Sequence, residues 1–113
     1  MPETTIFQKI INGEIPCKKL YEDEYCIAFN DIAAQAPVHF LVIPKKPIKS
    51  LLECMEEDSN LLGHLLLIGS KIVKSKNLKN WRTVINTGAE SGQTVFHLHI
   101  HFLSGRKMNW PPG

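Results

Sequence analysis

Three histidines stand at alternate positions near the end of the chain: His97, His99 and His101. Residues at i, i+2 and i+4 of a β-strand point to one side of the sheet, so we expect the three imidazoles to share a face. The intervening positions are all apolar: Phe96, Leu98, Ile100 and Phe102. Imidazole is the side chain that gains or loses a proton near neutral pH. The pattern therefore favours a chemical role for this face over that of ordinary half-exposed polar positions.

Two chemical roles are compatible with a row of imidazoles. In a zinc site the ligand nitrogens lie about 2.0–2.1 Å from the metal, whereas His97 and His101 are separated by roughly 13 Å of strand at about 3.3 Å per residue. No carboxylate or cysteine stands beside them to complete a ligand set. A neutral imidazole can instead attack phosphorus while its neighbours bind phosphate oxygens or donate protons. The sequence favours this second, metal-free role.

The segment before the histidine row is rich in glycine and hydrogen-bond donors. It runs from Gly88 to Thr94 and includes Gly92 and Gln93. Glycines allow backbone amides to approach an anion, and the Gln93 and Thr94 side chains add donors. No Gly-Lys-Ser or Gly-Lys-Thr follows, so the segment is not a Walker loop. Taken alone, it is a weak indication of phosphate binding.

The elements that must position this row follow from the hydrophobic periodicity. We expect a short helix over 6–11, a hairpin with strands at 20–21 and 26–29, further strands at 38–43, 82–85 and about 95–103, and a long helix that starts near Ser50 or Asp58. Gly63 and Gly69 interrupt the long helix at about 1 kcal/mol each relative to alanine, so they are expected to mark close packing. This order predicts a single α+β domain over residues 1–113 with a mostly antiparallel sheet.

The composition excludes several classes of protein. Hydrophobic residues make up 43% of the 113 residues and charged residues 21%, as in ordinary globular domains. A net charge of +2 without a long basic run does not indicate a nucleic-acid partner. Three cysteines without a Cys-x-x-Cys spacing indicate neither a disulfide scaffold nor a thiolate zinc site. The sequence shows no signal peptide and no apolar stretch long enough to span a membrane, so we expect a cytoplasmic protein with no membrane partner.

The segment 97–103, His-Leu-His-Ile-His-Phe-Leu, resembles the signature of the histidine triad superfamily. Further segments resemble its Hint branch: 6–7 with 13–16, 36–45, 92–95 and 110–113. The resemblance covers nearly the whole chain. It implies a homodimer of small α+β protomers, each with one long and one short helix. It also implies binding of purine nucleotides (AMP or GMP derivatives) and hydrolysis of nucleoside 5′-phosphoramidates, without a cofactor.

The resemblance also implies roles for individual residues. His99 would form a nucleotidyl-histidine intermediate, His101 would contact the phosphate and assist the departing amine, and His97 with His39 would form a supporting relay. The implied substrate-binding residues are Asn86, Gln93 and Thr94 at the phosphate or the 5′ oxygen, Asp31 at the ribose, Ile6, Phe7, Ile10, Phe29 and Ile32 at the base, and Trp110 near the C-terminus. No metal ligand is implied.

Three positions depart from the family pattern. Thr94 stands where serine is common, Asn109 where bulkier or basic residues occur, and Pro47 where a few relatives have a histidine regarded as a possible metal ligand. Three alternatives stay open: a dinucleoside polyphosphate hydrolase, a purine-nucleotide-binding module without turnover, and a metalloprotein. Without the resemblance, His39 would be interpreted as a packing residue and Asp31 as a turn residue.

Overall fold

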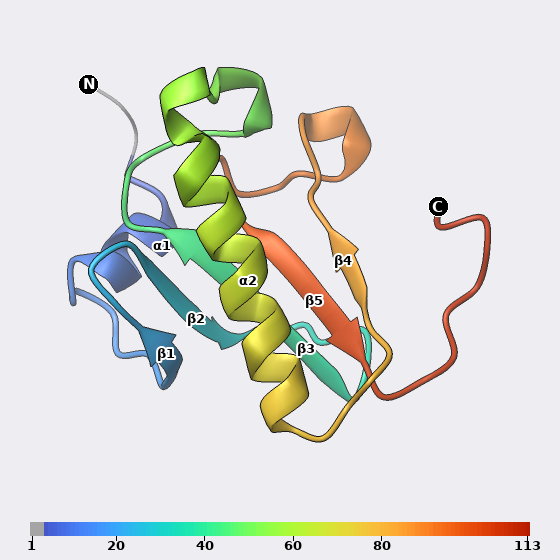
Figure 1. Ribbon diagram of the computed structural model, residues 1–113. Helices are drawn as coiled ribbons and strands as arrows, with labels where there is room; N and C mark the ends of the chain where they lie inside the picture. Colours follow the sequence, from blue (N-terminus) through green and yellow to red (C-terminus); the bar gives the residue numbers. More distant parts are fainter. Residues whose placement is uncertain (1–3) are drawn as a thin grey trace.

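The computed structural model describes residues 4–113 and contains one five-stranded sheet (Figure 1). The strands are β1 (Lys19–Glu22), β2 (Cys26–Asn30), β3 (Val38–Pro44), β4 (Arg82–Val84) and β5 (Ile100–Ser104). Their order across the sheet is β1-β2-β3-β5-β4, and every neighbouring pair is antiparallel. The predicted α+β class is therefore confirmed.

One short and one long helix accompany the sheet, as predicted. The helix α1 (Ile6–Ile11) begins after Thr5, whose hydroxyl oxygen accepts a hydrogen bond from a first-turn amide. The helix α2 (Ser59–Ser75) begins after Asp58, so the later of its two predicted starts is correct. Short 3-10 turns occupy Leu51–Glu53, Glu56–Asp58 and Ala89–Ser91. Within the described part of the chain, no helix has the length and apolar character needed to cross a membrane.

The two faces of the sheet are covered by different helices (Figure 1). Because side chains alternate along each strand, one set of strand residues packs beneath α2: Cys26, Ala28, Phe40, Val42, Ile100 and Phe102. The other set packs on the α1 side: Ile27, Phe29, Leu41 and Ile43, with Phe7 and Ile10 of the helix. The same alternation places His39 and His101 on the α1 side, opposite the main core.

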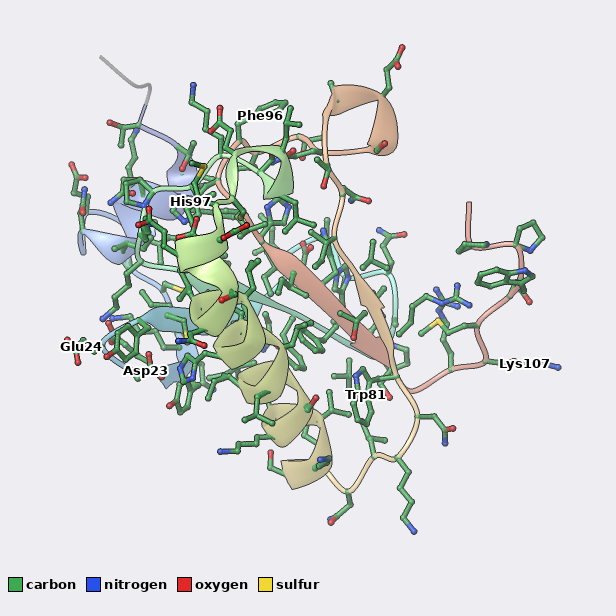
Figure 2. All side chains as sticks on the ribbon, turned by 45° about the horizontal axis from the view of Figure 1, so that its top comes forward. Asp23, Glu24, Trp81, Phe96, His97 and Lys107 are labelled. Atoms are coloured by element: carbon green, nitrogen blue, oxygen red, sulfur yellow. The ribbon has the colours of Figure 1, made fainter. Side chains whose placement is uncertain are left out.

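The last strand is shorter than predicted. It begins at Ile100 rather than near residue 95, because its ladder with β3 ends at the pair Val42–Ile100, and the last two residues of β3 pair with β2 alone. Before β5, the amide of Leu98 donates a hydrogen bond to the carbonyl of Ile48 (2.7 Å), which connects the histidine segment to the segment after β3. Phe96 was expected on the core face, but it is 45% exposed at the rim of the molecule (Figure 2). The apolar face therefore starts at Leu98.

A half-buried carboxylate joins the β1–β2 turn to α2. Asp23 Oδ2 lies 2.6 Å from His64 Nε2 and 2.9 Å from the Tyr21 hydroxyl, while Oδ1 accepts from the amides of Tyr25 and Cys26. Burial raises the pKa of Asp23, but these hydrogen bonds outweigh it and hold the pKa far below its usual range. His64 is thus a tether between two elements, a role that helical position alone did not indicate.

Candidate active site

A cavity of about 610 Å³ opens on the α1 side of the sheet. Its apolar wall consists of Ile6, Phe7, Ile10, Ile15, Phe29, Ile32, Leu41 and Val95. Its polar groups include Asp31, Asn86, Thr94, His99 and His101. An apolar cavity with a few convergent polar groups is the usual form of a small-molecule site. A second hollow of about 780 Å³ lies between β4 and the C-terminal segment, but it contains none of the histidines.

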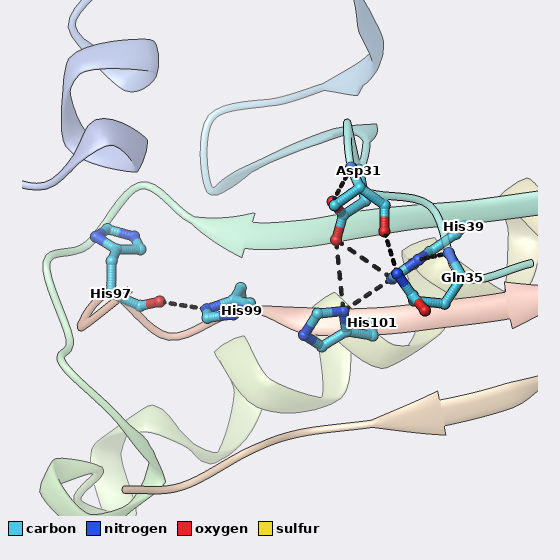
Figure 3. A network of polar contacts seen from close by, with 7 residues as sticks. Asp31, Gln35, His39, His97, His99 and His101 are labelled. Atoms are coloured by element: carbon cyan, nitrogen blue, oxygen red, sulfur yellow. Dashed lines mark hydrogen bonds and ion pairs between the residues drawn. The ribbon is translucent and has the colours of Figure 1, made fainter. Parts of the chain in front are cut away.

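His99 lines the cavity, and its Nδ1 is bound to the backbone. Its Nδ1 lies 2.7 Å from the carbonyl oxygen of His97 (Figure 3). Because a carbonyl oxygen can only accept, Nδ1 carries the proton and the neutral ring has its lone pair on Nε2. The ring also packs edge-on against Phe7, with centroids 5.0 Å apart. Backbone and aromatic contacts therefore fix the orientation of the imidazole and leave the lone pair on Nε2, as an attacking nitrogen would require.

His97 supports His99 through its backbone rather than through its ring. Its own Nε2 donates to the carbonyl of Pro44 at 2.8 Å, and the side chain is buried. Burial lowers the pKa of His97, and the hydrogen bond to Pro44 opposes this shift only in part. The resemblance implies a relay between His97 and His39, but the two residues do not act on the same ring here. His97 contacts His99, whereas His39 contacts His101.

His39 contacts His101 in a directional chain of hydrogen bonds (Figure 3). The backbone amide of Gln35 donates to His39 Nδ1 at 2.9 Å, so the proton of the neutral ring resides on Nε2. His39 Nε2 lies 2.9 Å from His101 Nδ1. That contact makes His101 Nδ1 the acceptor and leaves the proton of neutral His101 on Nε2. The two cavity imidazoles thus differ: His99 offers a lone pair and His101 offers an N–H.

The three supporting or donating rings are neutral at neutral pH. Burial lowers the pKa of His101 to about 4, His99 and His39 add to the shift, and Asp31 opposes it. Burial also lowers the pKa of His39, again against Asp31. Neutral rings are required for the hydrogen-bond directions given above, because an imidazolium cannot accept.

Acidification is expected to destabilise the protein between pH 6.5, the ordinary value, and about 4, the folded-state pKa of His101. In that window the unfolded chain binds a proton that the folded protein excludes, so the free energy of unfolding falls as pH falls. The contribution, about 3 kcal/mol at most, is fully present above this window and lost below it. Urea denaturation at about pH 7 and about pH 5 measures it. His101→Gln should lose less stability over this interval than the wild type, and an equal loss would contradict the assignment.

Two glycines shape the loop that leads to the histidines. Gly88 and Gly92 have φ values of +91° and +97°, and they flank the 3-10 turn Ala89–Ser91. Only glycine adopts such angles without strain. The loop brings Gly92 beside Asn86, so that both residues and Thr94 reach the cavity wall.

Gln93 does not reach the cavity, in contrast to its implied phosphate contact. Its Oε1 accepts from the Gly88 amide at 2.9 Å, and its Nε2 donates to the carbonyls of Lys49 (2.8 Å) and Val95 (3.1 Å). Both amide hydrogens are therefore used within the protein, and the side chain is buried. Gln93 ties the glycine-rich loop to the 45–50 segment instead of facing a ligand.

Trp110 also lies outside the cavity of its own chain. The indole is 82% exposed, and the C-terminal segment that carries it runs beyond the β4 edge of the sheet, away from α1 (Figure 1). Arg82 of β4 donates to the carbonyl of Asn109 at 2.8 Å and holds this segment in place. Within one protomer, the structure thus separates Trp110 from the other implied substrate-binding residues.

Sequence reasoning missed parts of the site. Cys17 and Lys18 line the cavity just after α1, next to the 13–16 segment that carried part of the resemblance. The amide of Gln35, which orients His39, had no signal in the sequence because every residue other than proline has such a donor.

Two groups of side chains have ligand atoms within 4.8 Å of one another, as a metal site requires: Asp23, Cys26 and His64, and Asp31, His39 and His101. In both groups the histidine nitrogens that face their partners already take part in hydrogen bonds or close ion pairs. The geometry favours proton networks over metal coordination in each case.

Comparisons with known proteins found relatives over nearly the whole chain. The family model described as "Scavenger mRNA decapping enzyme C-term binding" matches residues 4–110. A HIT-like protein of Synechococcus elongatus is 59% identical over 114 residues, covering 100% of both chains. A HIT family hydrolase from Legionella pneumophila superposes with a TM-score of 0.93 at 43% identity, covering 96% of this chain and 98% of the other. A histidine triad protein from Clostridium difficile gives 0.90 at 41% identity, with 96% and 97% covered.

Proposed function

The chain belongs to the histidine triad (HIT) superfamily, and on that basis we propose that it hydrolyses the P–N bond of purine nucleoside 5′-phosphoramidates through a nucleotidyl-histidine intermediate on His99. One observation carries this proposal: the carbonyl of His97, 2.7 Å from His99 Nδ1, leaves the nucleophilic lone pair on Nε2 of a ring that lines the cavity. Two of the solved relatives are described as HIT family hydrolases, which supports hydrolytic chemistry in this fold.

The cavity suits a nucleoside monophosphate derivative. The apolar wall between α1 and β2 offers flat contact for a base, and the carboxylate of Asp31 offers acceptors for ribose hydroxyls. Asn86 and Thr94 supply donors near His99, where an α-phosphoryl group would be placed. The methyl group of Thr94 leaves the hydroxyl available, so the departure from serine retains the chemistry.

The reaction has two displacement steps. His99 Nε2 attacks the α-phosphorus, the bond from phosphorus to the amine breaks, and the amine leaves with a proton that His101 supplies. Water then attacks the phosphorus, the bond to Nε2 breaks, and His101 takes up the water proton, which replaces the one given to the amine. The proton of His99 stays on Nδ1 throughout and is donated to the His97 carbonyl, whose oxygen stabilises the positive charge of the phosphorylated ring.

We extend the proposal to a homodimer. The strand β4 is an unpaired edge of the sheet within the protomer described, and the adjacent C-terminal segment exposes the indole of Trp110. An exposed edge and an exposed aromatic group are features that pairing with a second copy would cover.

Intact-protein mass spectrometry tests the proposal. After brief mixing with an AMP phosphoramidate and a quench without acid, the protein should carry the added mass of one AMP, and free AMP should accumulate. Parallel rates on a diadenosine polyphosphate distinguish the P–N substrate from a P–O–P substrate. Tight AMP binding without adduct or product on either substrate would instead indicate a nucleotide-binding module.

A further inference from the structure

The carboxylate of Asp31 has two distinct surroundings (Figure 3). Its Oδ1 accepts from the backbone amide of Ala33 at 2.9 Å, which fixes the loop after β2. Its Oδ2 lies 3.4 Å from His39 Nε2 and 3.9 Å from His101 Nδ1. The side chain is only 18% exposed and also lines the cavity. One oxygen is thus anchored, while the other is placed between two imidazoles.

The proton on His39 Nε2 therefore has two neighbouring acceptors. The first is His101 Nδ1 at 2.9 Å, and the second is Asp31 Oδ2 at 3.4 Å. His101 Nδ1 can accept this proton only while His101 is neutral. When His101 is an imidazolium, its Nδ1 becomes a donor and must find another acceptor. Asp31 Oδ2 is the carboxylate oxygen that both rings face.

We propose that Asp31, besides any contact with the ribose, is a positioning residue that lets His101 alternate between acid and base during the two displacement steps. This inference rests on the proposed phosphoramidate hydrolysis. In the free protein His101 is neutral, and it reaches the acid form by taking up a proton from solvent once the anionic phosphate of the substrate occupies the cavity. In that form, both His101 Nδ1–H and His39 Nε2–H donate to Asp31. His101 then transfers its Nε2 proton to the departing amine.

The same carboxylate prepares the second step. After the transfer, Asp31 keeps the remaining proton on His101 Nδ1, so that Nε2 has a lone pair. That lone pair accepts a proton from the water that attacks the phosphorus, and His101 becomes an imidazolium again. Protons balance over the cycle, because the one given to the amine is replaced by the one taken from water. The groups that face His101 in this exchange are Asp31, His39 and His99.

Two substrate comparisons test this role against a role in ribose binding alone. The first uses leaving groups: Asp31→Asn should lower kcat about tenfold or more on an alkylamine phosphoramidate, whose nitrogen must be protonated. It should change kcat by less than about twofold on the p-nitrophenyl phosphodiester of the same nucleoside, whose phenolate leaves unprotonated. The second repeats the amine assay with a 2′,3′-dideoxynucleoside. The defect should persist there, although no ribose hydroxyl remains for Asp31 to bind.

An NMR titration of the free protein gives a readout that requires no turnover. Because the Asp31 carboxylate raises the pKa of His101, Asp31→Asn should lower the fraction of protonated His101 at any acidic pH. Glu24→Gln, which removes a charge from the exposed β1–β2 turn, should leave this titration unchanged. Equal kcat losses on both leaving groups, a defect that disappears on the dideoxy substrate, or an unaltered His101 titration would each overturn the inference. If the wild-type protein were inactive on every phosphoramidate, the proposed function would be contradicted. The NMR titration would still show whether Asp31 controls the protonation of His101.

Discussion

Replacement of His99 by alanine is expected to reduce phosphoramidate turnover by roughly 10⁴-fold or more and to abolish the AMP adduct. The loss is large because covalent catalysis cannot proceed without the attacking nitrogen. Binding of AMP should be retained, because the apolar wall and Asp31 remain in place. Single-turnover kinetics and calorimetric AMP binding measure the two quantities separately.

Two controls make this result interpretable. Loss of the ring leaves the buried His97 carbonyl without its donor, at a cost of about 1–3 kcal/mol, so folding of the His99 variant is checked by circular dichroism. His64→Gln removes an imidazole on the α2 side of the sheet, away from the cavity, and should keep turnover within about twofold of the wild type. Substantial turnover in the folded His99 variant would exclude His99 as the nucleophile.

Alanine at Gly69 is expected to destabilise the protein by about 2–3 kcal/mol. Gly69 is buried in α2, and a methyl group there would overlap the ring of Phe102. That ring cannot move away easily, because it is 1% exposed and stacked on Phe40 at a centroid distance of 5.2 Å. Urea denaturation of the purified variant measures the change.

The same substitution at Gly63 should have the opposite sign. Gly63 is exposed one and a half turns earlier in α2, and no atom lies within 4 Å of the added methyl. Alanine there should raise the free energy of unfolding by up to about 1 kcal/mol, through helix propensity alone. Only one of the two glycines predicted to mark close packing therefore does so. Equal effects at both positions would contradict the contact between Gly69 and Phe102.

Local pattern was sufficient to predict most of the elements and the class of chemistry. Alternation determines that His99 and His101 avoid the side of Ile100 and Phe102, because successive side chains of an extended chain point in opposite directions. The capping residue Thr5 and the apolar spacing of α1 were likewise local signals. These features depend on residues a few positions apart, so the sequence contains them directly.

The partners of the histidines were decided by tertiary structure. In the β3–β5 pairing His39 is opposite Leu103 and Leu41 is opposite His101, which makes the two imidazoles diagonal neighbours on one face. A shift of one residue would move His39 to the other face. The ladder between β3 and β5 likewise ends at Val42 and Ile100, which shortens β5, and the internal hydrogen bonds of Gln93 turn it away from the cavity. By itself, the sequence determined which chemical groups are present and which side of the strand they take. Strand register and loop packing, which depend on residues far apart in the chain, decided which groups touch.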